Sequence, residues 1–270
     1  MPARRGVCKF LPSLLLVLCL VSISSAQKKK QIRVAAASDL QAVMPEIAAS
    51  FEAASGVSAE LIFGSSGNLF AQIQNGAPFD LFFSADSEFP SKLIQSGQAE
   101  PRSSVVYAIG RLVLWVAPGA KCDPQTEKWN CLLRPEISRV AIANPAHAPY
   151  GRAAVQALQA AHVYEQVRPK LVFGENISQT AQFVQSGNAQ AGLLSLSQAL
   201  SPSMQGGKQW EIPEGAYPAI EQGVVVLKSA HENSAAQDFV QFVTQGRGRG
   251  LLKKSGFRLP ENAQPQGRHK

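Results

Sequence analysis

Hydrophobic and polar residues alternate with two different periods along the chain. Short apolar runs, of which residues 32–37 are the first, are followed by stretches in which apolar residues recur every three or four positions, as at Leu40, Val43 and Ile47. The runs are typical of buried strands and the stretches of amphipathic helices. Because strands alternate with helices throughout, the chain is expected to adopt an α/β fold with mainly parallel sheets.

Some details of the first half of this pattern stay open. In the helix expected after Ser38, Pro45 either introduces a kink or marks the start of the main helical body. A buried strand is expected within residues 79–86, and Ser87 is expected to cap the helix that follows it. Residues 105–116 are rich in β-forming residues, and they fit either two strands or one long strand that crosses between domains.

The second half repeats the pattern. Apolar runs at residues 140–143, 171–173 and 191–194 each end in a polar turn, and the first two turns lead into helices. A run at residues 224–227 predicts a further strand, and Asn233 is expected to cap the last clear helix. The chain is therefore expected to contain two similar α/β units.

Residues 1–26 have the organisation of a signal peptide. Arg4, Arg5 and Lys9 form a positive region, residues 11–23 are apolar, and small residues at 24–26 mark a cleavage site. An uncleaved N-terminal anchor is the alternative, although the apolar run is short for a membrane span. Export to the periplasm is expected.

Composition and charge change this picture little. Removing Arg4, Arg5 and Lys9 with the signal peptide lowers the number of Lys and Arg residues from 26 to 23, against 19 Asp and Glu residues. Much of the remaining excess lies in Lys28–Lys30 and in the tail after Arg247. Aromatic residues are not interleaved with these basic residues as in nucleic-acid platforms, so no nucleic-acid partner is expected.

Cysteine usage fits an exported protein. Cys8 and Cys19 leave with the signal peptide, so the mature chain contains only Cys122 and Cys131. In an oxidising compartment a local disulfide is favoured, and closing this loop contributes about 2–3 kcal/mol. A metal site would need more ligands than two thiols, and no histidine lies nearby in the sequence.

The candidate chemistry lies at two serines. Ser38 follows the run 32–37 and Ser66 follows residues 60–64, and both precede a helical pattern. A strand that turns directly into a helix through serine leaves unpaired backbone N–H groups beside a hydroxyl. The positive end of the helix dipole points the same way, so the pair predicts an anion site without a charged side chain. For either serine alone, helix capping is the simpler interpretation.

Residue types that carry catalysis are sparse. The Gly64–Gly67 turn lacks the spacing of a hydrolase nucleophile elbow, and there is no P-loop or dinucleotide fingerprint. Asp80 and Asp86 could form a carboxylate pair, although capping and turn roles are commoner. His147 is interpreted as a loop residue and not as a catalytic base. A Ser-dependent hydrolase or transferase is the alternative from another class, but it lacks a neighbouring base.

An ordered set of motifs resembles the periplasmic molybdate-binding proteins of ABC importers. The set spans nearly all of the mature chain and comprises Ala35-Ala36-Ala37-Ser38, Phe63-Gly64-Ser65-Ser66-Gly67, Ala77–Asp80 with Ser84-Ala85-Asp86, Asn144-Pro145 with residues 147–151, and Ser255-Gly256-Phe257. The resemblance implies two α/β lobes, residues 27–110 plus 224–270 and residues 111–223, with a ligand cleft between them. It also implies a monomer without enzymatic activity or cofactor, whose partners are molybdate or tungstate and a membrane permease.

The resemblance further implies an oxyanion held only by neutral donors. Carried over to this chain, the donors are the hydroxyls of Ser38 and Ser66 and the backbone N–H groups of Tyr150 and Ile177. Ser195 occupies a position where the family often has a tyrosine hydroxyl. Because serine reaches less far, either Tyr150 compensates, a water bridges, or that contact is missing. Through Ser38, Ser66 and Ile177 the site is expected to bind the metal in the form of its oxyanion and not as a bare cation.

Ligand selectivity follows from what this predicted site lacks. A binding protein for sulfate or another tetrahedral oxyanion would share the architecture, and molybdate and tungstate are too alike to be ranked. Phosphate carries a proton near neutral pH and is expected to be rejected, because the site offers that proton no acceptor. Asp39 is expected to cap its helix or face solvent. Affinity is then expected to be flat between about pH 6 and 8, since no predicted site residue titrates there.

Overall fold

The computed structural model describes residues 1–3, 30–230 and 234–261. Residues 4–26 of the predicted signal peptide lie outside this part of the chain, as does Asn233, the predicted cap of the last helix. None of the helices in the described part combines the length and the apolar character that crossing a membrane requires.

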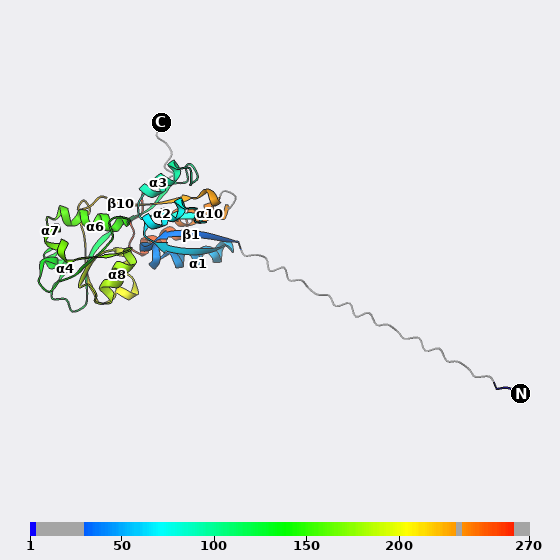
Figure 1. The fold of residues 1–270 in the computed structure, drawn as a ribbon, viewed down its shortest axis with the longest axis horizontal. Coiled ribbons are helices and arrows are strands. Elements are labelled where there is room, and N and C mark those ends of the chain that lie inside the picture. Colours follow the sequence, from blue (N-terminus) through cyan, green and yellow to red (C-terminus); the bar gives the residue numbers. More distant parts are fainter. Residues whose placement is uncertain (4–29, 231–233, 262–270) are drawn as a thin grey trace.

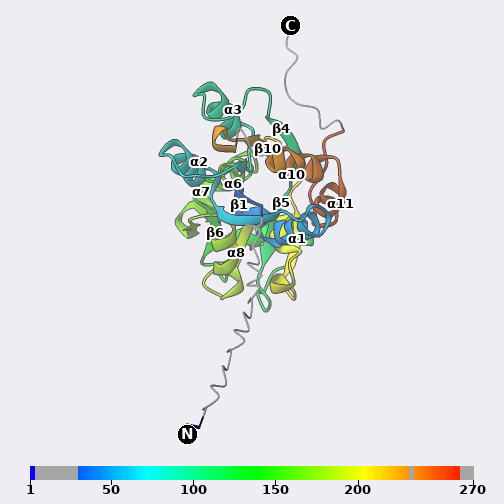
Figure 2. The same cartoon turned by 90° about the vertical axis from the view of Figure 1, so that its right-hand side faces the viewer.

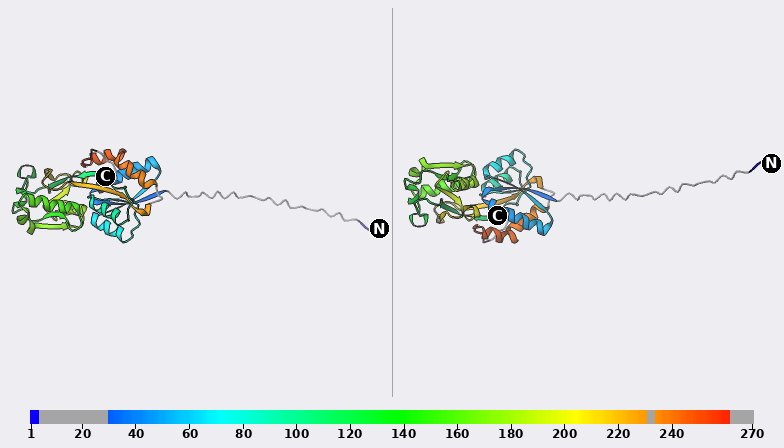
Figure 3. Two further views of the ribbon diagram at one scale, coloured as in Figure 1. Left: turned by 90° about the horizontal axis from the view of Figure 1, so that it is seen from above. Right: turned by 90° about the horizontal axis from the view of Figure 1, so that it is seen from below.

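The chain folds into two lobes that lie side by side, each built on a five-stranded sheet (Figures 1 and 3). The first sheet, in the order β2-β1-β3-β10-β4, contains β1 Gln31–Ala37, β2 Ser58–Gly64, β3 Leu81–Phe83, β4 Val105–Gly110 and β10 Ile220–Val226. The second sheet, in the order β7-β6-β8-β5-β9, contains β5 Leu112–Val116, β6 Val140–Ala143, β7 Leu171–Gly174, β8 Ala191–Ser195 and β9 Lys208–Glu211.

In each sheet four strands run in one direction and a single strand runs against them. The reversed strand is β10 in the first sheet and β5 in the second. Each is the strand with which the chain enters the lobe after crossing from the other lobe. The predicted two-lobed α/β fold with mainly parallel sheets is confirmed.

Helices cover both faces of each sheet. In the first lobe they are α1 Met44–Ser55, α2 Ser66–Gln74, α3 Glu88–Gln95, α10 Ser234–Thr244 and α11 Arg247–Lys254, with the 3-10 turns η1 Ser38–Ala42 and η4 Lys228–Ala230. In the second lobe they are α4 Pro124–Glu127, α5 Asn130–Leu133, α6 Pro149–Ala160, α7 Tyr164–Val167, α8 Ile177–Gln185 and α9 Leu196–Ala199, with η2 Arg168–Lys170 and η3 Pro202–Met204.

Alternation along β1 explains how the first lobe is layered. Val34 and Ala36 pack in one cluster with residues of α1, α10 and α11, whereas Ala35 packs in another with residues of α2 and α3. Successive side chains of a strand point to opposite faces, so a fully apolar strand is buried from both sides. Figure 2 shows α2 and α3 on one side of β1, and α1, α10 and α11 on the other.

The chain crosses between the lobes at Arg111 and again between β9 and β10. Residues 105–116 therefore form two strands in different sheets, which decides between the two arrangements that the sequence allowed. The two crossings are tied together, because Arg111 Nε donates to Glu211 Oε1 at 2.6 Å and the Leu112 N–H donates to the Tyr217 hydroxyl at 3.0 Å.

Two expectations about helix starts are decided by the structure. Pro45 lies in the first turn of α1, so the main helical body begins there, after the separate turn η1. Ser87 precedes α3 but makes no side-chain cap, and that prediction is wrong. Its backbone is already helical, at φ −94° and ψ −8°, whereas a capping residue needs an extended backbone. Asp86 Oδ1 accepts the Phe89 N–H at 3.0 Å instead.

Cys122 and Cys131 form a disulfide, with their Cα atoms 5.6 Å apart. The bridge closes the segment that contains α4 and the start of α5, at the edge of the second lobe's core. Both cysteines are buried in that core.

Candidate functional site

A small cavity of about 10 Å³ lies between the lobes, and it has about the room of one water molecule. From the first lobe it is lined by the turns that follow β1 and β2, with Ser38 and Ser66. From the second lobe it is lined by the first turns of α6 and α8, with Tyr150 and Ile177. The cavity thus lies beyond the carboxyl ends of strands, where open α/β sheets bind their ligands.

Ser66 is the first residue of α2 and is buried. Its hydroxyl oxygen accepts the Ala85 N–H at 2.9 Å, which leaves the hydroxyl proton available to a ligand. The neighbouring Ser65 has an extended backbone and caps α2, because its Oγ accepts the Asn68 N–H at 3.4 Å. The Ser65 side chain therefore caps α2, whereas the Ser66 hydroxyl can donate to a ligand.

Ser38 begins η1 and is likewise buried. Its carbonyl oxygen accepts from Ser178 Oγ and from Gln198 Nε2, both at 2.9 Å and both from the second lobe. Its hydroxyl has no hydrogen-bond partner within the described residues. The backbone of Ser38 is thus held by the opposite lobe while its side chain stays available as a donor.

The backbone N–H groups of Tyr150 and Ile177 are also available. Both belong to the first turn of a helix, where N–H groups have no partner within the helix. Neither N–H makes a hydrogen bond to another described residue. Asn176 caps α8 by accepting the Gln179 N–H at 3.0 Å, one turn further on. Two helix N-termini with free donors therefore face one small cavity, an arrangement that favours negative charge.

Ser195 is the one predicted site residue that does not line the cavity. It is fully buried and caps α9, with its Oγ accepting the Gln198 N–H at 3.2 Å and lying 3.0 Å from Ser197 Oγ. In this conformation the Ser195 hydroxyl caps α9. Its contact with a ligand stays a prediction.

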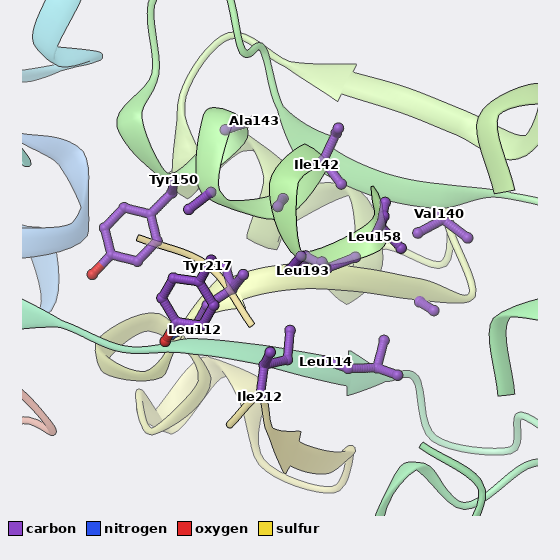
Figure 4. Packing of buried hydrophobic residues seen from close by; sticks show 14 of the residues in the cluster. Leu112, Leu114, Val140, Ile142, Ala143, Tyr150, Leu158, Leu193, Ile212 and Tyr217 are labelled. Atoms are coloured by element: carbon purple, nitrogen blue, oxygen red, sulfur yellow. The ribbon is translucent and has the colours of Figure 1, made fainter. Parts of the chain in front are cut away.

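The side chain of Tyr150 extends the second lobe toward the first. Its ring lies at the edge of the second lobe's core, with the hydroxyl pointing away from Leu158 and Val140 (Figure 4). The hydroxyl oxygen accepts from Gln222 Nε2 at 3.2 Å, and Gln222 Oε1 accepts the Tyr107 hydroxyl at 2.7 Å. These three side chains form a buried polar network between the lobes.

Asp39 joins this network, which the sequence did not indicate. It lines the cavity, is fully buried, and accepts from Gln222 Nε2 through Oδ2 at 2.5 Å. Its Oδ1 has no hydrogen-bond partner within the described residues. Burial raises the pKa of the Asp39 carboxyl from 3.8 to about 7, although Gln222 and Tyr150 oppose the shift.

The expectation that Asp39 caps its helix or faces solvent is wrong. The turn that contains it is covered by the second lobe, from which Ser197 Oγ donates to the Asp39 carbonyl at 2.8 Å. The residues around Asp39 in the sequence could not predict that the second lobe buries this turn, because Ser197 lies far along the chain. A cavity predicted to contain only neutral donors thus also contains a carboxyl, and the expectation of an affinity that is flat with pH loses its basis.

The lobes touch directly around the cavity. The Gly67 N–H donates to the His147 carbonyl at 2.9 Å, and His147 Nδ1 lies 3.0 Å from Ser65 Oγ. The side chains of Asn68 and Glu175 are hydrogen-bonded across the same gap. These contacts hold the protein in a closed form, and they give His147 a role between the lobes that goes beyond the predicted loop position.

Ser65, His147 and Glu175 form a chain of polar contacts, with His147 Nε2 3.6 Å from Glu175 Oε2. Ser65 is buried, however, and its oxygen is engaged by the N–H group that it caps. No group of three or more His, Cys, Asp or Glu residues in the described part of the chain could hold a metal ion.

Comparison with known proteins places this geometry among binding proteins. Residues 32–258 match a family model described as "Bacterial extracellular solute-binding protein". The molybdate-binding protein ModA of Rhodobacter capsulatus is 39% identical over 212 residues, which cover 78% of this chain and 82% of that protein. ModA of Azotobacter vinelandii is 37% identical over 238 residues, which cover 88% and 93%.

Solved structures agree with these relatives. The periplasmic molybdate-binding protein of Azotobacter vinelandii has a TM-score of 0.79 and 32% identity, covering 85% of this chain and 100% of that chain. The sulfate-binding protein SubI of Mycobacterium tuberculosis has a TM-score of 0.71 at 16% identity, covering 87% of this chain and 88% of that one. The second likeness is one of fold alone, so the fold by itself does not select the anion.

Proposed function

The chain belongs to the bacterial extracellular solute-binding proteins, and from this premise we propose that it captures molybdate between its lobes and delivers it to the permease of an ABC importer. Tungstate is proposed as a second ligand, because it is nearly the same size and charge. The relatives named as molybdate-binding proteins support this choice of anion. We also propose that the protein works in the periplasm, to which residues 1–26 direct it.

The observation that carries the proposal is the donor set of the cavity. The hydroxyls of Ser38 and Ser66 and the N–H groups of Tyr150 and Ile177 converge on one small space from both lobes. All four are neutral donors, and hydrogen bonds from such donors are strengthened when the acceptor is charged. A fully deprotonated tetrahedral oxyanion presents only acceptors, so it matches these donors, and it would bridge the lobes once they part slightly, because the present cavity has the room of about one water molecule.

We propose that the protein acts as a monomer, without a cofactor, and catalyses no reaction. Within the described residues neither the Ser38 nor the Ser66 hydroxyl contacts a histidine or carboxylate that could serve as a base. Ser65, which does contact a histidine in the described part of the chain, has its oxygen engaged in capping α2. Turnover of ester substrates by the purified protein would contradict this part of the proposal.

A thermal-shift experiment with separate oxyanions tests the function. Molybdate and tungstate are expected to raise the melting temperature, since binding to the native state alone adds about 2.7 kcal/mol at a free concentration of roughly a hundred times Kd. Sulfate is smaller and is expected to stabilise less. If millimolar molybdate and tungstate both leave the melting temperature unchanged, the proposal fails. Elemental analysis of protein purified without added metal should find molybdenum or tungsten.

A further inference from the structure

We propose that the oxyanion binds together with one proton, which the carboxyl of Asp39 holds, so that Asp39 is neutral in the ligand-bound site. The inference rests on the proposed function, because it concerns the same cavity. It assigns Asp39 as an additional residue that determines when and how tightly the anion binds.

The position of Asp39 is the first support. It follows Ser38 directly, lines the cavity and is fully buried. Gln222 donates to Oδ2 and the Tyr150 hydroxyl also favours the ionised carboxylate, but Oδ1 is buried without a hydrogen-bond partner among the described residues. A buried carboxylate with one unsatisfied oxygen is costly, whereas a protonated carboxyl can donate from that oxygen.

The elements packed against Asp39 supply no positive charge. The titratable groups that face it are Tyr107 of β4 and Tyr150 of α6, and burial raises the pKa of both hydroxyls well above the ordinary value, so both are neutral. Helices α8 and α9, which pack against η1, contain no charged residue. Arg33 of β1 is paired with Glu60 of β2 at 3.1 Å.

The remaining charged side chains nearby are paired or exposed. Asp86 Oδ2 accepts from Arg152 at 2.6 Å, and the two charges offset one another. Glu46 on α1 and Glu221 on β10 are exposed to solvent. No cation contributes to the shift in the pKa of Asp39. A dianion in the cavity therefore has no positive side chain to separate it from this carboxyl.

Repulsion between the oxyanion and an ionised Asp39 carboxylate opposes binding unless the carboxyl carries a proton. A carboxylate and a dianion in one closed, desolvated cavity repel strongly, because the effective dielectric constant there is low. Burial already brings the pKa of Asp39 to about 7 against the opposing hydrogen bonds, and an adjacent anion raises it further. Protonation of Asp39 removes this repulsion. Above neutral pH, binding must therefore take up a proton from solvent.

The test is the dissociation constant of molybdate between pH 6 and 9, measured by isothermal titration calorimetry. For the unmodified protein, Kd is expected to rise about tenfold per pH unit above pH 7, to roughly a hundredfold by pH 9. Asp39→Asn cannot ionise, so its Kd is expected to change less than about threefold over the range. Asp238→Asn, which removes an exposed carboxyl on α10, is the matched control and should keep the steep dependence.

A second measurement needs no variant. At pH 8 the binding enthalpy of the unmodified protein, compared in two buffers of different ionisation enthalpy, should show nearly one proton taken up per molybdate. Molybdate binding with no proton uptake and a flat Kd overturns the inference but leaves the proposed function intact. Displacement of molybdate by comparable phosphate also overturns it, because Asp39 would then accept the phosphate proton as a carboxylate. If no oxyanion binds at any pH, the proposed function itself fails.

Discussion

At the scale of single residues, the neighbours Ser65 and Ser66 have different roles in one turn, since Ser65 caps α2 and Ser66 is proposed to bind the ligand. Ser66→Ala removes a proposed hydrogen bond to a charged ligand, worth about 1.5–3 kcal/mol, so Kd for molybdate should rise roughly ten- to hundredfold. Ser65→Ala removes the cap of α2, so it should lower the free energy of unfolding by about 1 kcal/mol and affect Kd less. Calorimetry and urea unfolding of both variants separate the effects. The reverse order in Kd would mean that the turn is misassigned.

Asp39 makes stability itself depend on pH. Its pKa is about 7 in the folded protein, against 3.8 as the ordinary value, so between these pH values only the folded state keeps the proton. The stabilisation is therefore complete below about pH 4 and is lost as the pH rises to about 7. In the absence of oxyanion, the free energy of unfolding of the unmodified protein should fall relative to Asp39→Asn by as much as about 3 kcal/mol between pH 5 and 8.

Urea unfolding at both pH values measures this difference. Asp238→Asn again serves as the control, because it removes an exposed carboxyl on α10 and leaves Asp39 in place. Parallel pH profiles for the unmodified protein and Asp39→Asn would show that the Asp39 carboxyl titrates normally.

At the scale of elements, the disulfide supports the second lobe without touching the site. Cys122 and Cys131 bracket α4 and do not line the cavity. Replacing both with serine opens the loop, which should lower the free energy of unfolding by about 2–3 kcal/mol and leave Kd for molybdate unchanged. Denatured, unreduced protein should show no free thiol. A loss of affinity in the double variant would reveal a role for this loop in binding.

The elements also show which patterns are readable in a sequence. The strands and helices around Ser38, Ser66 and Ile177 were predictable, because each combines a clear apolar run with local turn chemistry. Strand β9 and helix α11 were not, since Lys208–Glu211 and Arg247–Lys254 are rich in polar residues. Their structure depends on pairing with β5 and packing against α10, which are tertiary contacts.

At the scale of the whole molecule, closure of the lobes depends on close approach at Gly67. A Cβ atom there would lie 2.8 Å from both the Cβ and the carbonyl oxygen of His147, so alanine would hold the lobes apart. Overpacking of this kind costs about 1–3 kcal/mol, so Gly67→Ala should raise Kd about five- to hundredfold. X-ray scattering at saturating molybdate should show a larger radius of gyration than for the unmodified protein.

Gly250→Ala is the matched control for closure. No heavy atom lies within 4 Å of a Cβ at that position, and alanine favours a helix. Its affinity and scattering should match those of the unmodified protein. Equal affinities for the two glycine variants would show that contact between Gly67 and His147 does not limit closure.

The sequence by itself determined the features that depend on near neighbours. Apolar periodicity specified the α/β fold, and serine at a strand–helix junction specified donors at Ser38 and Ser66. The backbone donors at Tyr150 and Ile177 were named through the resemblance, and their N–H groups are free because both residues lie in a first helical turn. These properties need only a few adjacent residues, so a local pattern is enough to predict them.

Only the tertiary structure decided the features that depend on partners far along the chain. Gln222, which binds the Asp39 carboxyl, is 183 residues away from it, and Ser65 meets His147 across the gap between the lobes. Burial and electrostatic environment depend on which residues the fold brings close in space. A local sequence pattern does not predict which distant residues these are. For this reason the serine donors could be named from the residue pattern and the backbone donors through the resemblance, whereas the buried Asp39 carboxyl became visible only once the two lobes were in place.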